Sequence, residues 1–207
     1  MINEEVSNLS NMQIDALREI GNVGAGNAAT SLSMLLNRPV QMKVPRVSIV
    51  LLDKVWEVIG EPEELIAGIY LRVQGAAPGS MLFILPWENA CKLVDILLGK
   101  DEGSTRELGE IERSALMEVG NILVATYLNA LNMFTGLEFY PSVPALATDM
   151  QGAIISAVVL PLAEVGDYVL IVETEYTENG RQIVGHLLFL PDPGSLTTIL
   201  AKVGVIE

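Results

Sequence analysis

Glu19-Ile20-Gly21-Asn22 returns 99 residues later (118 − 19) as Glu118-Val119-Gly120-Asn121, so one four-residue phrase occurs in both halves of the chain. Each copy belongs to a longer pattern, D/S-x3-E-x2-N-x22-P, whose outer positions are Asp15 and Pro45 in the first copy and Ser114 and Pro144 in the second. Internal repeats set the architecture of a chain, so they come before other patterns. The repeat predicts two equivalent halves, each carrying a carboxylate and an amide at a fixed spacing.

The composition indicates a globular protein with a large core. Half of the 207 residues are hydrophobic and 18% are charged, and the mean hydropathy of +0.42 is high for a soluble protein. The net charge of −14 argues against nucleic acid and anionic membranes as partners, because both attract Lys and Arg. The single Cys91 excludes an internal disulfide and fits a reducing compartment. The first residues lack the basic and apolar segments of a secretory signal, so a cytoplasmic protein is expected.

Apolar residues recur at helical spacing around each copy of the phrase. In the first half, Ser10-x-x-Gln13 has the pattern of a capping box and Asn37-Arg38-Pro39 ends the run, so a long helix is expected between them. In the second half, a helix is expected from about residue 109 to residue 133, and Gly136 ends it. Shorter helices are predicted at residues 87–98 and 195–203.

Apolar, β-branched runs between turn residues predict the strands. They fall at residues 40–44, 47–52, 67–73, 80–85, 153–159, 168–174 and 182–190, with a loop or short helix at 57–65 and a hairpin turn at Asn179-Gly180. Met81–Pro86 is matched by His186–Pro191 at an offset of 105 (191 − 86), so the two halves run in the same order. We therefore expect an α+β fold with pseudo-two-fold symmetry. Two α-β-β-X-β halves, at about residues 8–99 and 105–207, are expected to form a single domain over residues 1–207.

Several features have ordinary structural interpretations beside functional ones. Gly21, Gly24 and Gly26 suggest nucleotide binding, but a helix and not a strand precedes them, which favours close packing of this helix against a sheet or another helix. His186, the only histidine, lies in an apolar strand and is interpreted as part of the core or a partly exposed strand. Cys91 is expected to be a buried thiol, and no cluster of residues predicts a metal site in this chain.

Two further features concern apolar residues. The uncharged stretch at residues 119–137 is about long enough to span a membrane, but its Asn and Thr side chains would be costly in lipid, so membrane insertion is not expected. The methionines are expected to fill gaps in the core, and they include Met12, Met34, Met81 and Met133.

The polar positions of the repeat form a stripe along each helix, because residues at i, i+4 and i+7 share one face. Asp15, Glu19 and Asn22 occupy this stripe in the first half. The ordinary interpretation of one such stripe is a solvated surface. Two copies in the same register favour a reused site, although shared ancestry of the halves remains an alternative explanation of the pattern.

The duplicated pattern, together with the phrase that runs from Glu19 to Ala28, resembles the CheC family of bacterial chemotaxis phosphatases, a group that includes CheX and FliY. The resemblance covers nearly the whole chain and extends to residues 145–153. It implies a pseudo-two-fold CheC-like fold in which two long motif helices are exposed. It also implies an enzyme that removes the phosphoryl group from an aspartate of a CheY-type response regulator.

The resemblance further assigns roles to the repeated residues. Glu19 and Asn22 would form one catalytic site, and Glu118 and Asn121 a second. An amide can orient water beside an already reactive acyl phosphate, whereas a carboxylate would be repelled by the phosphoryl oxygens. Glu could pair with a Lys of the regulator. The remaining motif residues, Asp15, Ser114, Pro45 and Pro144, are expected to support the site. The chain is expected to need no cofactor, with Mg²⁺ held by the regulator.

A binding function is the alternative to catalysis. By the same resemblance, the chain is expected to bind a CheD-type chemoreceptor glutamine deamidase as well as the regulator. Residues 147–153, with Asp149 as their only acid, could offer the surface for this partner, but an ordinary loop or short helix explains them equally well. A non-catalytic module that sequesters the deamidase or the regulator, or a scaffold in the flagellar switch, would have no need of two intact Glu/Asn pairs.

Overall fold

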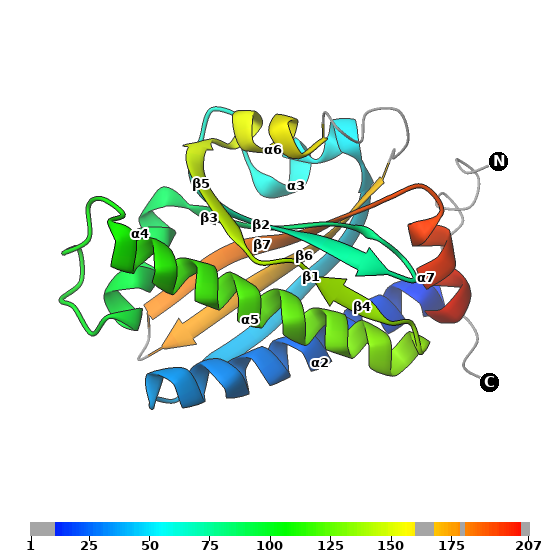
Figure 1. Cartoon of the computed structure of the whole chain (residues 1–207), viewed down its shortest axis with the longest axis horizontal. Helices are drawn as coiled ribbons and strands as arrows, with labels where there is room; N and C mark the ends of the chain where they lie inside the picture. Colours follow the sequence, from blue (N-terminus) through cyan, green and yellow to red (C-terminus); the bar gives the residue numbers. More distant parts are fainter. Residues whose placement is uncertain (1–10, 160–167, 179–180, 204–207) are drawn as a thin grey trace.

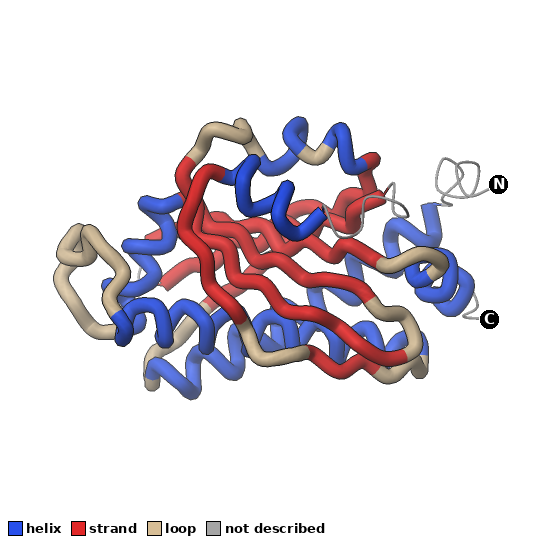
Figure 2. The backbone as a smooth tube through the Cα atoms, turned by 45° about the horizontal axis from the view of Figure 1, so that its top comes forward, coloured by secondary structure: helices blue, strands red, loops and turns tan. Residues whose placement is uncertain are grey.

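The computed structural model describes residues 11–159, 168–178 and 181–203. One antiparallel sheet has helices packed on both of its faces (Figures 1 and 2). The strands are β1 (Gln41–Leu51), β2 (Leu65–Gly75), β3 (Gly79–Pro86), β4 (Phe139–Pro141), β5 (Ala145–Met150), β6 (Tyr168–Glu178) and β7 (Arg181–Pro191). The helices are α2 (Asn11–Leu36), α3 (Trp56–Ile59), α4 (Trp87–Leu97), α5 (Glu110–Thr135), α6 (Gln151–Val159) and α7 (Ser195–Val203), with a 3-10 turn, η1 (Leu52–Lys54).

The two halves of the chain exchange strands. The order in the sheet is β1-β6-β7-β3-β2, and both β4 and β5 pair with β2 at the other edge. β1 comes from the first half and pairs with β6 of the second half. In the same way, β5 comes from the second half and pairs with β2 of the first half. Each half therefore completes the sheet of the other.

The halves meet where β3 pairs with β7, and the register of this pair is symmetric. Leu82 pairs with Leu188, and Phe83 pairs with Leu187. The sequence repeat relates β3 to β7 by 105 residues, which takes Leu82 to Leu187 (82 + 105) and Phe83 to Leu188 (83 + 105). Exchanging the halves thus turns one residue pair into the other. The predicted pseudo-two-fold α+β fold is confirmed, and its axis passes between these two residue pairs.

The central strands separate two hydrophobic cores. Met81, Phe83 and Leu85 of β3 face the larger core, which lies under α2, α4, α5 and α7. Leu82 and Ile84 face the smaller core, which lies under α3 and α6. All five side chains are buried. Burial of an aliphatic or aromatic side chain stabilises a fold by about 1.5–3 kcal/mol, so these strands contribute on both faces.

The sequence predictions were correct for most elements and wrong for three segments. The two motif helices, β2, β3, α4, β6, β7 and α7 lie where they were expected. The two strands predicted at residues 40–44 and 47–52 are one strand, β1 (Gln41–Leu51), with a register shift between Lys43 and Arg46. Residues 139–141 and 145–150 form β4 and β5, which were not predicted.

Residues 153–159 were predicted to form a strand but lie in helix α6. A short apolar run cannot be assigned to strand or helix by periodicity alone. The helix begins at Gln151, which is buried. Its backbone N–H donates to the carbonyl of Glu64 (2.8 Å), and its side-chain amide donates to the carbonyl of Ile59 (3.4 Å). Ile154 and Ile155 then face the smaller core. The tertiary contacts at its start, and not the residue types, select the helix.

The methionines do not behave alike. Met81 is buried as predicted, but Met34 and Met133 are 73% and 64% exposed, so the prediction that they fill the core was wrong. These two residues are 99 apart (133 − 34) and hold equivalent places near the ends of the two motif helices. The side chain of Met12, the capping residue Ser10 and the turn Asn179-Gly180 lie outside the described residues. The division of the chain into one domain with halves at about 8–99 and 105–207 stays a prediction.

The connection between the halves is attached to the first half by a buried carboxylate. Asp95 of α4 is 1% exposed. Its oxygens accept the backbone N–H groups of Gly103 (2.8 Å) and Thr105 (3.0 Å). Burial raises the pKa of Asp95, but the hydrogen bonds from Thr105 and Gly103 outweigh it, so that the pKa lies below its ordinary value. The ionised side chain therefore holds the loop that leads into α5.

Replacing Asp95 with Asn should remove about 1–3 kcal/mol of the free energy of unfolding at pH 7, because one of the two N–H groups would face an amide NH2 that cannot accept, and the other would keep only an uncharged acceptor. A lowered folded-state pKa stabilises above the unfolded-state pKa of about 3.9 and ceases to stabilise as the pH falls through the folded-state value. Urea unfolding of wild type and Asp95→Asn should thus show a difference that shrinks below about pH 4. Asp101→Asn, at an exposed site in the same connection, is the matched control. An equal difference at all pH values would contradict the assignment.

Candidate active site

The two motif helices pack side by side and antiparallel on one face of the sheet (Figure 1). Glycines allow the two helices to lie close to each other and to the sheet. A Cβ at Gly24 of α2 would lie 2.9 Å from the ring of Tyr127 in α5, and a Cβ at Gly120 of α5 would lie 2.5 Å from Ile69 of β2. The interpretation of these glycines as packing residues is therefore confirmed for Gly24 and for Gly21, where a Cβ would lie 3.3 Å from Val44, and it extends to Gly120. It was wrong for Gly26, which is exposed and where a Cβ would have no atom within 4 Å.

The first Glu/Asn pair lies on the outer face of α2. Leu17 and Ile20 of this helix are buried in the larger core. Glu19 and Asn22 are exposed. Residues three apart on a helix have Cβ atoms about 5–6 Å from each other, so the carboxylate and the amide can act on one bound group.

The second pair repeats this arrangement on α5 with one difference. Leu116 and Val119 face the core. Glu118 is exposed, and Asn121 is half-buried. The second amide is therefore less accessible than Asn22, although the sequence pattern around the two is the same.

Both pairs are free of partners among the residues that the structure describes. No hydrogen bond or ion pair within residues 11–159, 168–178 and 181–203 engages the side chain of Glu19, Asn22, Glu118 or Asn121. By contrast, Asp15 pairs with Arg18 one turn along α2 (Oδ1 to Nη1, 3.2 Å), and both side chains are exposed. An exposed ion pair of this kind contributes little to stability. The two Glu/Asn pairs are thus available to a molecule that approaches the helices.

The motif prolines lie where strand pairing is interrupted. Pro45 lies in β1 at the register shift between Lys43 and Arg46. Pro144 lies between β4 and β5, which pair separately with β2. Proline has no N–H to donate, so in sheets it is confined to edges and irregularities. The structure thus gives both prolines the same place in the fold, in the segment that follows each motif helix.

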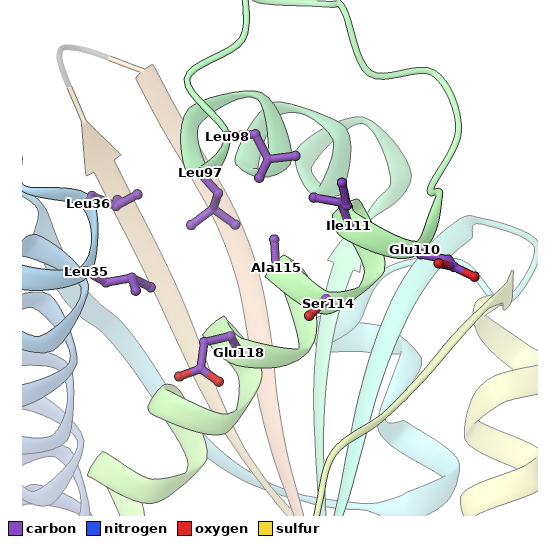
Figure 3. A pocket seen from close by; sticks show the side chains of 9 residues that line it. All are labelled: Leu35, Leu36, Leu97, Leu98, Glu110, Ile111, Ser114, Ala115 and Glu118. Atoms are coloured by element: carbon purple, nitrogen blue, oxygen red, sulfur yellow. The ribbon is translucent and has the colours of Figure 1, made fainter.

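A groove runs beside the second pair and holds about 520 Å³ (Figure 3). Ser114 and Glu118 of the motif form part of its lining. The other lining residues are Leu35, Leu36, Leu97, Leu98, Glu110, Ile111 and Ala115. Sequence reasoning did not find this groove, since its lining comes from three helices whose packing a single sequence does not display.

The candidate partner-binding residue Asp149 lies elsewhere, on strand β5 at the edge of the sheet. Its side chain is exposed, and one oxygen accepts the backbone N–H of Met150 (2.7 Å). Ala147 and Thr148 are exposed beside it. The surface predicted at residues 147–153 is therefore accessible over its first four residues, and from Gln151 it turns into α6.

The other candidate residues, Cys91 and His186, occupy structural positions. Cys91 is buried, and burial raises the pKa of its thiol. His186 lies on β7 between Ile84 and Glu173, and burial lowers its pKa while the charge of Glu173 opposes this. Among the described residues, no group of three or more His, Cys, Asp and Glu side chains is placed to hold a metal ion. α5 is long and apolar enough to span a membrane, but 56% of its most apolar window is buried within the protein, as in the core helix of a globular fold.

The Glu/Asn motif occurs twice, on two paired surface helices that cover a sheet whose halves exchange strands. These features define the class of this protein, and comparison with known proteins agrees. The sequence profile of the CheC-like family matches residues 12–49 and again residues 111–147, which contain the two motif helices. A relative from Bacillus subtilis (strain 168), named CheY-P phosphatase CheC, is 38% identical over 196 residues, or 93% of this chain and 94% of the relative. The chain belongs to the CheC-like family, and the resemblance drawn from the motif is confirmed.

Solved structures share the fold at lower identity. FliY from Thermotoga maritima matches with a TM-score of 0.78 and 21% identity over 97% of this chain and 100% of that one. A chain of the CheX-CheY-BeF3-Mg+2 complex from Borrelia burgdorferi matches with a TM-score of 0.50 and 16% identity over 82% of this chain and 96% of that one. At these identities the likeness concerns the fold alone.

The packing of the motif helices can be tested with two glycines of α2. Gly24→Ala should destabilise the protein by about 1–3 kcal/mol, because the new methyl group overlaps Tyr127 and the helices must separate. Gly26→Ala is the matched control, since a Cβ at Gly26 has no atom within 4 Å. It should stabilise by about 0.5–1 kcal/mol through helix propensity. Urea unfolding midpoints of the two variants should shift in opposite directions, and shifts in the same direction would contradict the close approach at Gly24.

Proposed function

We propose that this protein hydrolyses the phospho-aspartate of a CheY-type response regulator, with one catalytic pair on each motif helix. The observation that carries the proposal is that both Glu/Asn pairs are accessible and without partners among the described residues. The name of the Bacillus subtilis relative, a CheY-P phosphatase with 38% identity to this chain, supports the same activity. Such a reaction belongs in the cytoplasm, where response regulators carry signals.

The amide of each pair positions the attacking water. The carbonyl oxygen of Asn22 or Asn121 accepts a hydrogen bond from a water molecule held in line with the bond between phosphorus and the aspartyl oxygen. The water oxygen forms a new bond to phosphorus, the bond to the aspartyl oxygen breaks, and the aspartate leaves as a carboxylate. Inorganic phosphate carries away the remaining protons of the water. Since little covalent chemistry is required, positioning and stabilisation of charge supply most of the acceleration.

The carboxylate of each pair attaches the enzyme to the regulator. Glu19 and Glu118 are exposed one helical turn from their amides, so each can pair with a Lys that lies beside the phosphorylated aspartate. A charge-assisted hydrogen bond of this kind fixes orientation as well as distance. The Mg²⁺ that neutralises the phosphoryl oxygens belongs to the regulator in this mechanism, and the chain itself contributes no metal ligand or cofactor.

A second binding function is favoured by the position of Asp149. The exposed residues Ala147, Thr148 and Asp149 lie on the edge strand β5. They border a groove of about 280 Å³ between β2, β5 and α6. We propose that a CheD-type deamidase binds this edge. If the Glu/Asn pairs proved inactive, sequestration of the deamidase or the regulator would be the remaining function.

Replacement of the amides tests the catalytic proposal. Asn22→Ala and Asn121→Ala should each lower the rate of phosphate release from a Mg²⁺-loaded, phosphorylated regulator, and the double variant should lose on the order of a hundredfold or more, by analogy with other positioned catalytic amides. Ala favours helices, so the fold should be retained. Asn27→Ala and Asn129→Ala, at exposed asparagines of the same helices, are matched controls. Full activity of the Asn22→Ala/Asn121→Ala variant would contradict this mechanism.

The edge-strand proposal has its own test. Asp149→Ala should weaken binding of a CheD-type deamidase by several-fold or more, because an exposed charged partner is lost from the centre of the surface. Isothermal titration calorimetry measures the affinity. Glu107→Ala removes one negative charge from an exposed position in the connection between the halves and serves as the control. Equal affinities of the Asp149→Ala and Glu107→Ala proteins would place the deamidase elsewhere.

A further inference from the structure

The groove beside the second Glu/Asn pair is apolar although it lies at the surface. Leu35 is 53% exposed and Ile111 is 68% exposed. Figure 3 shows Leu35 and Leu36 of α2 on one side of the groove, with Ala115 and Glu118 of α5 opposite them. Leu97 and Leu98, at the end of α4, complete the apolar lining. Two of the three contributing helices, α2 and α4, come from the first half of the chain, whereas Glu118 comes from the second.

Its size and lining are those of a binding site. A volume of about 520 Å³ falls in the range of roughly 300–1,000 Å³ that ligand pockets occupy. Exposed apolar surface with a polar rim marks places where another molecule docks. The only charged residues in the lining, among those that the structure describes, are Glu110 and Glu118, so the rim is acidic.

We propose that this groove receives an apolar side chain of the phosphorylated regulator while the phospho-aspartate lies over Glu118 and Asn121. This inference rests on the proposed phosphatase function and adds a substrate-docking site to it. The first half of the chain thereby contributes apolar residues that bind the regulator, while the Glu/Asn pair of the second half acts on its phospho-aspartate.

The groove adjoins the second motif, and this position identifies the molecule that binds in it. Ser114 and Glu118 line the groove and also belong to the catalytic stripe. A protein that places its phospho-aspartate beside Asn121 therefore covers the groove as it binds. The acidic rim requires that the apolar side chain be flanked by Lys or Arg, which agrees with the Lys that Glu118 is proposed to bind. A second copy of this chain is a poor fit, because it brings a net charge of −14 against the same charge.

The test isolates the second site. In the Asn22→Ala chain, turnover passes through Glu118 and Asn121 alone. Adding Leu35→Ser and Ile111→Ser should raise KM for the phosphorylated regulator about tenfold or more, because apolar contacts of two side chains are lost on binding. The kcat should change little, since neither side chain touches the phosphoryl group. Leu35→Met and Ile111→Leu should restore KM.

The controls separate docking from folding. Leu51→Ser, an exposed leucine at the end of β1, should leave KM unchanged. The Leu35→Ser/Ile111→Ser pair is also measured in the Asn121→Ala chain, where turnover passes through the first site. An equal rise of KM in both backgrounds would show a general loss of structure and overturn the proposal. Binding of a BeF3-loaded regulator, measured by calorimetry, should weaken in parallel with KM.

The remaining outcomes are distinct. If wild type does not accelerate phosphate release at all, the proposed function itself fails. If wild type is active and the two serine substitutions leave KM and the affinity unchanged, only the docking inference fails. If wild type sediments as a dimer that the same substitutions dissociate, the groove joins two copies of this chain and the proposal is wrong.

Discussion

Pairing of β3 with β7 is the constraint on which the rest of the structure depends. Both strands are buried on two faces, so they cannot shift by one residue without moving a whole set of side chains into the opposite core. Their symmetric register sets the halves about a two-fold axis between the Leu82–Leu188 and Phe83–Leu187 pairs. Once this pair has formed, β6 and β2 lie on either side of it. The free edge of β6 pairs with β1 of the first half, and the free edge of β2 pairs with β4 and β5 of the second half.

The same axis brings the motif helices together. Because α2 and α5 precede equivalent strands, the symmetry lays them antiparallel on one face of the sheet, where Gly24 admits Tyr127 between the helix backbones. Their outer faces then carry both Glu/Asn pairs on one side of the molecule. Symmetry is incomplete at the level of side chains, since Asn121 is half-buried and Asn22 is exposed. The two Glu/Asn pairs, which are equivalent in the repeat, therefore differ in the accessibility of their amides.

Local patterns in the sequence were sufficient for the two motif helices, α4 and α7, and insufficient for helix α6 and for the exchange of strands in the sheet. The helix bounds and the exposure of Glu19, Asn22 and Glu118 follow from a 3.6-residue period that the sequence displays directly. Exchange of β1 and β5 between the halves depends on pairings more than 70 residues apart, for which a single sequence carries no local signal. α6 was misassigned because its β-branched residues suit a strand, whereas hydrogen bonds at Gln151 decide for a helix.

Surface apolar residues were the other difficulty. Met34 and Leu35 follow the helical pattern of the core, yet both side chains are exposed near the end of α2. The repeat could have drawn attention to these residues, because Met34 and Met133 occupy equivalent positions in the two halves.

Exchange of strands also has a consequence for how the protein forms during synthesis. Gln41 of β1 pairs with Thr177 of β6, 136 residues later (177 − 41), so the first half leaves the ribosome with an apolar strand that has no partner yet. Contacts this distant in sequence form slowly, because a long loop must close before they stabilise the chain. During that interval the unpaired edges of β1 and β2 are exposed to other nascent chains. The first half therefore has no complete sheet until the pairing partners in the second half have been synthesised.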